Sequence, residues 1–272
     1  DVYKRQEQNL SKKTRTESDL IGSREVPESA LYGVQTLRGI ENFRISKFHL
    51  NEYPLFIQAL AITKMGAAVA NRELDLLTEE QADAILKACK EILEGKHHDQ
   101  FPVDMIQGGA GTTTNMNANE VIANRALELM GHQRGEYQYC SPNDHVNRSQ
   151  STNDAYPTAI HIGLYYTHLK LVKHFEVLIE SFRKKATEFA HVIKMGRTQL
   201  EDAVPMTLGQ TFNGFASILR HEVKNLDFAA QDFLTVNMGA TAIGTGITAE
   251  PEYAEKCIAA LRKITGLDIK PV

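Results

Sequence analysis

Three short polar segments carry the residue types best suited to binding a small anion through neutral donors. The first is Gly108–Asn117, in which a glycine cluster and three threonines stand before an apolar-periodic stretch. Glycines that open onto a helix leave backbone N–H groups free at the positive end of the helix dipole. No Gly-Lys-Ser/Thr follows and no strand pattern precedes, which excludes a nucleotide P-loop and a dinucleotide fingerprint. An ordinary capped helix start explains these residues equally well.

The second segment is Ser151–Asp154 and the third is Gly196–Asp202. Taken alone, each has a structural explanation: Asn153 or Asp154 as a helix N-cap in the second, and an interhelical loop with an Arg–acid pair in the third. All three segments stand at predicted helix ends. A long helical bundle could gather such ends at one level, where hydroxyl and amide donors together would suit a small dicarboxylate.

Helical periodicity dominates from Leu55 onward, whereas strand signals are weak throughout. We predict a helix over Leu55–Leu74 and a second one beginning at Thr78, which with Gln81 forms a capping box, and stopping at Gly95. A third helix is predicted from Met116 to Met130. The segment from Ser18 to Asn51 is expected to form loops and short elements.

Two long helices are expected after Pro157 and from Thr207, each about 30 residues and hence about 45 Å long. The segment Met195–Pro205 must turn the chain back, so these helices should pack antiparallel. A last short helix is predicted to start with Pro251 at its first position and to stop at Gly266. The predicted fold is therefore mainly α: a helical N-terminal domain followed by a long antiparallel helical bundle.

The composition indicates a soluble globular protein, since 42% of the 272 residues are apolar and 24% are charged. A net charge of −4 argues against a nucleic-acid partner, and no apolar run is long enough for a membrane span. The N-terminal residues 1–15 show no secretory signal pattern, and residues 1–6 share no pattern with the rest of the chain. The three scattered cysteines are predicted to be reduced thiols: Cys89, Cys140 and Cys257. The ten histidines form no ligand motif and are expected mostly at surfaces or interfaces.

Three blocks, in order, give the chain a family resemblance: Gly108–Asn124, Pro142–Asp154 and Gly196–Gln210. From Leu20 to its end the chain resembles the fumarase/aspartase superfamily. That resemblance implies an L-aspartase-like fold, with an N-terminal lyase domain over residues 7–141 and part of the central bundle over 142–272. It also implies a cytoplasmic homotetramer whose active sites are shared between subunits, and no metal or other cofactor.

Within the superfamily, Gly22–Phe43 and Met105–Thr113 are similar to the aspartase branch, and Gln199 fits one group of aspartases. The implied reaction is the reversible elimination of ammonia from L-aspartate to give fumarate. Two alternatives stay open. One is a class II fumarase, and the other is a non-catalytic structural relative, because lyase relatives have been recruited as lens crystallins.

The resemblance also assigns roles to individual residues. Six match positions that bind the substrate's carboxylates and amino group: Thr112, Ser151, Thr152, Asn153, Thr198 and Gln199. Four weaker candidates stand nearby, of which the last two match a turn that contributes to a second carboxylate site in fumarases: Thr113, Asn117, Asn143 and Asp144. Neutral donors would stabilise the aci-carboxylate that forms when the carbon beside a carboxylate loses its proton, each contributing about 3 kcal/mol in comparable oxyanion sites.

One feature of the family is not present in the sequence. Relatives carry their proton-abstracting serine in a Gly-Ser-Ser-x-x-Pro-x-Lys-x-Asn loop, and no such segment occurs before Val272. We therefore expect no catalytic base in this chain, an incomplete bundle, and no activity of this polypeptide by itself. We also expect exposed apolar helix faces that the complete protein would bury.

Overall fold

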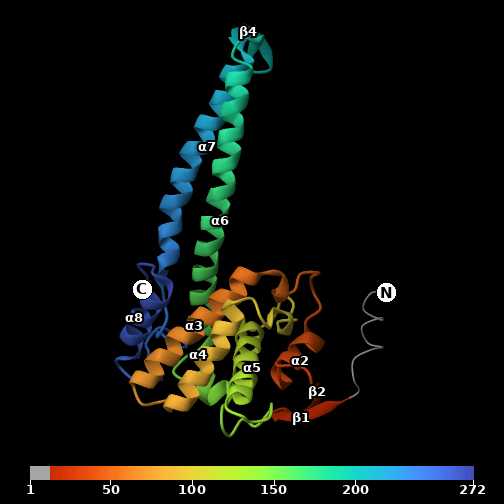
Figure 1. Ribbon diagram of the computed structural model, residues 1–272, viewed down its shortest axis with the longest axis vertical. Helices are drawn as coiled ribbons and strands as arrows, with labels where there is room; N and C mark the ends of the chain where they lie inside the picture. The colour runs from red at the N-terminus through yellow and green to blue at the C-terminus, as the bar shows by residue number, and fades with distance from the viewer. Residues whose placement is uncertain (1–12) are drawn as a thin grey trace. The chain divides into compact units, whose positions relative to one another are not determined.

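The computed structural model describes residues 13–272 (Figure 1). Predictions about residues 1–6, and about the first residues of the N-terminal domain, lie outside this range. The chain is mainly α-helical, as predicted. It forms two compact units, one reaching up to Gly163 and resuming over Thr235–Val272, and the other spanning Leu164–Leu234. The predicted domain boundary between residues 141 and 142 stays a prediction.

Four helices form the core of the first unit: α3 (Pro54–Glu73), α4 (Glu79–Leu93), α5 (Thr112–Leu129) and α8 (Tyr253–Thr265). Helix α3 packs against the other three, and α4 also packs against α5 (Figure 1). Almost every residue of α3 from Ile57 to Asn71 is buried. A helix that is apolar nearly all round belongs in the middle of a core, so α3 is surrounded by neighbours.

The predicted capping box is confirmed at the start of α4. The Thr78 hydroxyl accepts a hydrogen bond from the Gln81 N–H at 3.2 Å, and the Gln81 side chain accepts one from the Thr78 N–H. Gly266 ends α8 with a φ of 70°, as predicted. Pro251, however, is not the first residue of α8, because that helix begins two residues later, at Tyr253.

Helix α5 begins at Thr112 and not, as predicted, at Met116. Its first turn precedes the apolar pattern because the Gln107 side chain caps it. The Gln107 amide oxygen accepts the Thr114 N–H at 2.7 Å, and its nitrogen donates to the Thr114 hydroxyl at 2.8 Å. A side chain seven residues away thus replaces the usual N-cap residue.

Helix α6 (Thr152–Glu188) likewise starts before Pro157. The Ser151 hydroxyl accepts the Asn153 N–H at 3.1 Å, and the Asp154 carboxylate accepts the Ser151 N–H at 2.9 Å. Pro157 removes the N–H that would bond the Asn153 carbonyl. That carbonyl instead accepts a hydrogen bond from the Asn237 side chain at 3.0 Å, so the helix continues through the proline.

Short strands account for segments in which no strands were predicted. Strands β1 (Thr14–Asp19) and β2 (Gly22–Pro27) form an antiparallel hairpin, as do β3 (Ile193–Thr198) and β4 (Glu201–Thr207). Two-residue strands β5 (Thr235–Val236) and β6 (Lys270–Pro271) pair in parallel. The remaining short elements are α2 (Val34–Asn42), η1 (Leu50–Glu52), η2 (His98–Gln100), the π-turn η3 (Pro142–Val146) and η4 (Gln231–Leu234).

Helix α2 is held against α5 by a buried carboxylate. Glu120 of α5 accepts hydrogen bonds from the N–H groups of Gly33, Gln35 and Thr36, at 2.8, 2.8 and 3.0 Å. Burial raises the pKa of Glu120, and these bonds to the free N–H groups of the α2 terminus oppose that rise. A side chain at Gly39 would overlap the Thr113 methyl group, so a glycine there lets α2 reach the start of α5.

The second unit consists of the later part of α6, the β3–β4 hairpin and α7 (Leu208–Ala230), with the two helices antiparallel as predicted (Figure 1). Helix α6 has 37 residues in all and α7 has 23, where about 30 each was expected. Phe182 of α6 and Phe189, the residue after the end of that helix, pack on Phe212 of α7, with ring centroids 6.0 and 5.9 Å apart. His168 of α6 is 8% exposed and bonds Asp227 of α7 at 2.9 Å, so it lies at the interface between the two helices.

Large apolar side chains stay exposed along α6 and α7, as predicted. They include Leu164, Leu169, Leu171, Val177, Leu178, Phe215, Ile218 and Phe228. Across residues 13–272, no helix is both long and apolar enough to span a membrane.

Candidate functional site

The first donor segment and the residues just before the second meet at a buried lysine in α3. Lys64 is 1% exposed, and its ammonium group donates to the side-chain oxygens of Asn115, Asn147 and Gln150 at 2.7, 3.0 and 2.8 Å. A protonated lysine has three N–H donors and no acceptor, so three amide oxygens satisfy it. Asn115 belongs to the first segment, and the other two residues precede the second.

The amide side chains extend this network. Asn115 donates from Nδ2 to Asn147 Oδ1 at 3.1 Å and to Thr152 Oγ1 at 3.2 Å. Asn119 also donates to Asn147 Oδ1, at 3.1 Å. Because the Thr152 oxygen accepts the Asn115 bond, the Thr152 hydroxyl hydrogen remains available to a ligand. The structure thus joins two segments that lie about 40 residues apart in the sequence.

Burial lowers the pKa of Lys64 to about 7. The negative charge of Asp154 opposes this shift, as do the nearby thiols of Cys89 and Cys257. Burial also raises the pKa of Asp154. Lys64 was not singled out from the sequence, although a lone lysine inside the apolar run of α3 is a usable signal, since lysines are almost never fully buried without a partner.

The glycine cluster of the first segment forms a tight left-handed loop before α5. Gly109, Ala110 and Gly111 have φ angles of 76°, 49° and 95°. A side chain at Gly111 would overlap the Tyr156 ring, so this position needs glycine for space as well as for backbone conformation. The loop leads into Thr112, which is exposed and donates its hydroxyl to the Gly109 carbonyl at 2.7 Å.

The weaker candidates of the first segment lie in two environments. Thr113 is half-buried beside Gly39 of α2. Asn117 is fully buried, and its Nδ2 donates to the Gln100 carbonyl at 2.9 Å, so its side chain serves the core.

The second segment is braced by a glycine-rich stretch, Met238–Gly246, which the sequence patterns did not reveal. Asp154 is fully buried, and its carboxylate accepts the N–H groups of Gly239 and Thr241 at 3.2 and 2.8 Å. Asn153 is exposed and donates to the Ala242 carbonyl at 2.9 Å. Like the cluster at residues 108–111, this stretch is dense in glycine, and that similarity is the signal that could have found it.

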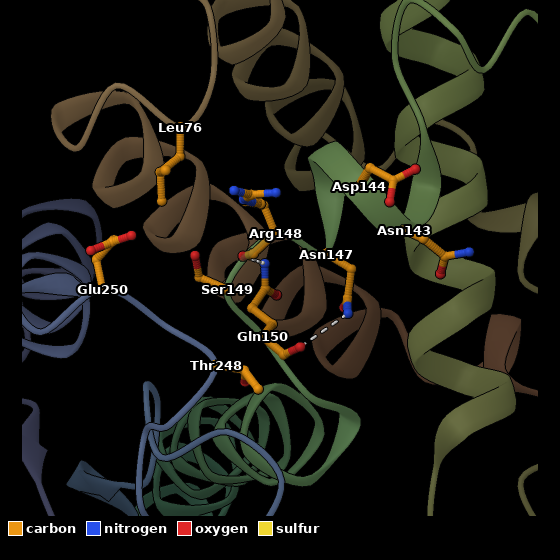
Figure 2. A pocket seen from close by; sticks show the side chains of 9 residues that line it. All are labelled: Leu76, Asn143, Asp144, Asn147, Arg148, Ser149, Gln150, Thr248 and Glu250. Carbon is orange, nitrogen blue, oxygen red and sulfur yellow. Dashed lines mark hydrogen bonds between the residues drawn. The ribbon is translucent and has the colours of Figure 1, made fainter.

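Asn143 and Asp144 line a polar cavity of about 330 Å³ in the first unit. Figure 2 shows Thr248 and Glu250, from the segment before α8, on the side of this cavity away from Asn143. Gln150 also lines it, and Figure 2 marks the hydrogen bond between the Asn147 amide and the Gln150 carbonyl. The cavity is therefore adjacent to the Lys64 network, with which it shares two side chains.

Thr198 and Gln199 lie in the second unit, at the turn of the β3–β4 hairpin, and both are exposed. Gln199 and Leu200 have φ angles of 49° and 69°, which identifies a two-residue turn of the type that hairpins favour. Arg197 and Asp202 form the expected Arg–acid pair at 3.3 Å. The structure thus assigns the six predicted site residues to two units, with Thr112, Ser151, Thr152 and Asn153 in the first.

A sequence profile of the lyase family matches residues 22–271. This chain belongs to the lyase family. It is 54% identical to an aspartate ammonia-lyase of Escherichia coli K12, over 96% of this chain and 55% of that protein. It is 55% identical to an aspartate ammonia-lyase of Pseudomonas fluorescens, over 94% of this chain and 54% of that one. The chain therefore spans about half the length of the curated relatives it matches.

Two solved structures resemble the fold closely. A fumarate lyase:delta crystallin from Brucella melitensis, bound to cobalt, matches with a TM-score of 0.93 and 50% identity, over 96% of this chain and 56% of that one. A class II fumarase from Schistosoma mansoni matches with a TM-score of 0.86 and 36% identity, over 93% and 53%. The resemblance to the fumarase/aspartase superfamily is confirmed by these matches.

The first unit thus offers hydroxyl, amide and backbone donors. Among residues 13–272, no group of three or more His, Cys, Asp or Glu side chains is arranged to hold a metal ion. Neutral donors fixed by a packed core can bind carboxylate oxygens and stabilise added negative charge on them.

Proposed function

We propose that the full-length protein is an aspartate ammonia-lyase, which removes ammonia from L-aspartate to give fumarate. The observation that supports this most is the Lys64 network, which joins the first and second donor segments at one place. The curated relatives at 54% and 55% identity carry that name, which favours L-aspartate as the substrate.

In this proposal the substrate's carboxylates and amino group bind to Thr112, Ser151, Thr152 and Asn153. Thr198 and Gln199 complete the site from other subunits of a homotetramer. Loss of the proton beside one carboxylate gives an aci-carboxylate, and the fixed donors stabilise its additional charge. Ammonia then leaves from the neighbouring carbon. The exposed apolar faces of α6 and α7 support an assembly of this kind.

The base is a serine in the family's Gly-Ser-Ser-x-x-Pro-x-Lys-x-Asn loop, which the 272 residues do not contain. We therefore propose that this polypeptide by itself has no turnover, and that the complete protein acts in the cytoplasm. Expression of both lengths, with fumarate formation as the readout, tests this directly. Turnover by the 272-residue chain would contradict it.

A class II fumarase is the second candidate, favoured by the structural match at 36% identity. The two differ in substrate, so purified full-length protein should be incubated separately with L-aspartate and with L-malate. Fumarate is followed through its ultraviolet absorbance, and released ammonia is measured in parallel. Fumarate and ammonia from L-aspartate alone support the ammonia-lyase, whereas fumarate from L-malate alone identifies a fumarase.

A further inference from the structure

The buried ammonium group of Lys64 dictates the orientation of three amide side chains. A protonated lysine only donates hydrogen bonds, so each partner must present its oxygen and not its NH₂ group. Asn115, Asn147 and Gln150 all do so, at 2.7 to 3.0 Å. Their NH₂ groups are consequently turned away from Lys64, in directions that the lysine fixes.

For Asn115 this orientation reaches a residue of the proposed site. Its NH₂ group, directed away from Lys64, donates to Thr152 Oγ1 at 3.2 Å. A hydroxyl that accepts such a bond cannot donate back along it, so its hydrogen is free to point elsewhere. If the amide were reversed, the Asn115 oxygen would face Thr152 and would accept a hydrogen bond from the Thr152 hydroxyl.

The surroundings of Lys64 offer no other hydrogen-bond partner among the described residues that would account for its burial. The charged or titratable groups facing it are Asp154 at the start of α6, Cys89 on α4 and Cys257 on α8, and none of them is hydrogen-bonded to its ammonium group. Burying a lysine costs free energy unless its donors are used. The three amide oxygens use them all.

We propose that Lys64 is a positioning residue, which orients the Asn115 amide so that the Thr152 hydroxyl donates its hydrogen to a substrate carboxylate. This inference rests on the proposed function, because it assigns the carboxylate to Thr152. Lys64 itself does not touch the substrate. It acts through Asn115, on a side chain that does.

Two variants of the full-length protein test the chain of contacts, in assays below pH 7 where Lys64 keeps its proton. Lys64→Met removes the donors that fix the amides while keeping the length of the side chain. Asn115→Asp keeps an acceptor for Lys64 and replaces the NH₂ group by a second oxygen, which draws the Thr152 hydrogen away from the substrate. Thr63→Val is the matched control, since Thr63 is equally buried on α3 and its hydroxyl donates to the Ala59 carbonyl, at 2.9 Å.

We expect Lys64→Met and Asn115→Asp each to raise KM for the substrate by about tenfold or more, as for a lost hydrogen bond to a charged group. In a protein that already carries Thr152→Val, either variant should raise KM by less than about a further twofold, because Lys64 and Asn115 act through the Thr152 hydroxyl. Thr63→Val should leave KM unchanged. Circular dichroism and gel filtration establish that each variant folds and assembles. If Lys64→Met fails to fold or assemble, the test rests on Asn115→Asp, which keeps the lysine and an acceptor for it.

A KM for Asn115→Asp within about twofold of the wild type, or fully additive effects with Thr152→Val, would overturn the proposal. A wild-type protein without turnover of L-aspartate would instead defeat the proposed function. The two failures are therefore distinguishable.

Discussion

The two compact units bury their residues to very different extents. In the first, α3 is enclosed by three helices, and the Lys64 network lies inside that core. In the second, α6 and α7 meet along one face only, and large apolar side chains such as Phe215 and Phe228 are exposed. The first unit thus holds its donors in place by itself, whereas the second presents its two predicted site residues on an exposed hairpin.

This difference separates what one chain can position from what an assembly must supply. Donors in a packed core are preorganised, and preorganised donors are those that stabilise a developing charge. Thr198 and Gln199 have no such support from the described part of the chain. We infer that partner subunits cover the exposed faces of the second unit and bring this hairpin to a site.

The largest expected effect concerns stability. In the 272-residue polypeptide, Ile122→Ala on the fully buried face of α5 should lower the free energy of unfolding by about 2–5 kcal/mol, through lost burial and a cavity. Ile218→Ala on α7, where the side chain is 60% exposed, should cost less than about 0.5 kcal/mol. Urea denaturation followed by circular dichroism measures both. Equal losses would remove the distinction between the units.

The second prediction concerns activity in the full-length protein. Ser151→Ala in the first unit and Thr198→Val in the second should each lower kcat/KM by about 10²-fold, the effect of one oxyanion donor. If sites are shared between subunits, refolding the two inactive variants together should restore part of the activity, because some sites then receive both intact residues. A mixture as inactive as its components would place both residues in one subunit's site.

The third prediction is a pH dependence that comes from Lys64. Its pKa is lowered to about 7 by burial, from an ordinary 10.5, while the pKa of each neighbouring thiol, Cys89 and Cys257, is raised to about 12. Between pH 7 and 10.5 the Lys64 amine keeps its proton in the unfolded chain and has lost it in the folded chain. Lys64 therefore makes the free energy of unfolding rise with pH over this range. Below about pH 7 both states are protonated, and this contribution is flat.

Lys64→Met should abolish that rise between about pH 7 and 10, while Asp154, which faces Lys64 from α6, is left intact. Denaturant unfolding of the wild type and of Lys64→Met at several pH values gives the comparison. Parallel curves for the two proteins would show that Lys64 keeps its ordinary pKa.

The smallest expected effect is the same in both units. Thr78 and Thr207 each cap a helix through a capping box with the residue three positions later. Because capping is local, Thr78→Ala and Thr207→Ala should each lower the free energy of unfolding by about 1 kcal/mol, whatever the packing around them. Thermal melts of the two variants test this, and a cost confined to the first unit would mean that α7 frays at its start.

Local signals predicted α3 and α4 well. The apolar pattern of α3 and the Thr78 capping box located two helices to within a residue or so. The hairpins escaped prediction because their strands lack alternating apolar residues. In β1 only Glu17 is buried and in β2 only Val26, so no period of two was visible.

The candidate site could be predicted only in part. Family motifs named Thr152, but its link to the first segment runs through Lys64 and Asn115, and such a tertiary contact leaves no trace in sequence periodicity. Gln107 escaped for the same reason, since it caps α5 from outside the helix. Thr198 and Gln199 are candidates whose partners would belong to other chains, so one sequence could name them without placing them in a site.

The most direct test of the proposed site is the affinity of the full-length protein for fumarate, a dicarboxylate that needs no turnover to bind. Isothermal calorimetry should compare the wild type with Thr112→Val and with Thr187→Val, whose hydroxyl also bonds a backbone carbonyl but lies on exposed α6. We expect Thr112→Val to weaken binding by about tenfold or more, and Thr187→Val to leave it unchanged. Equal affinity in all three proteins would contradict a dicarboxylate site at the first donor segment.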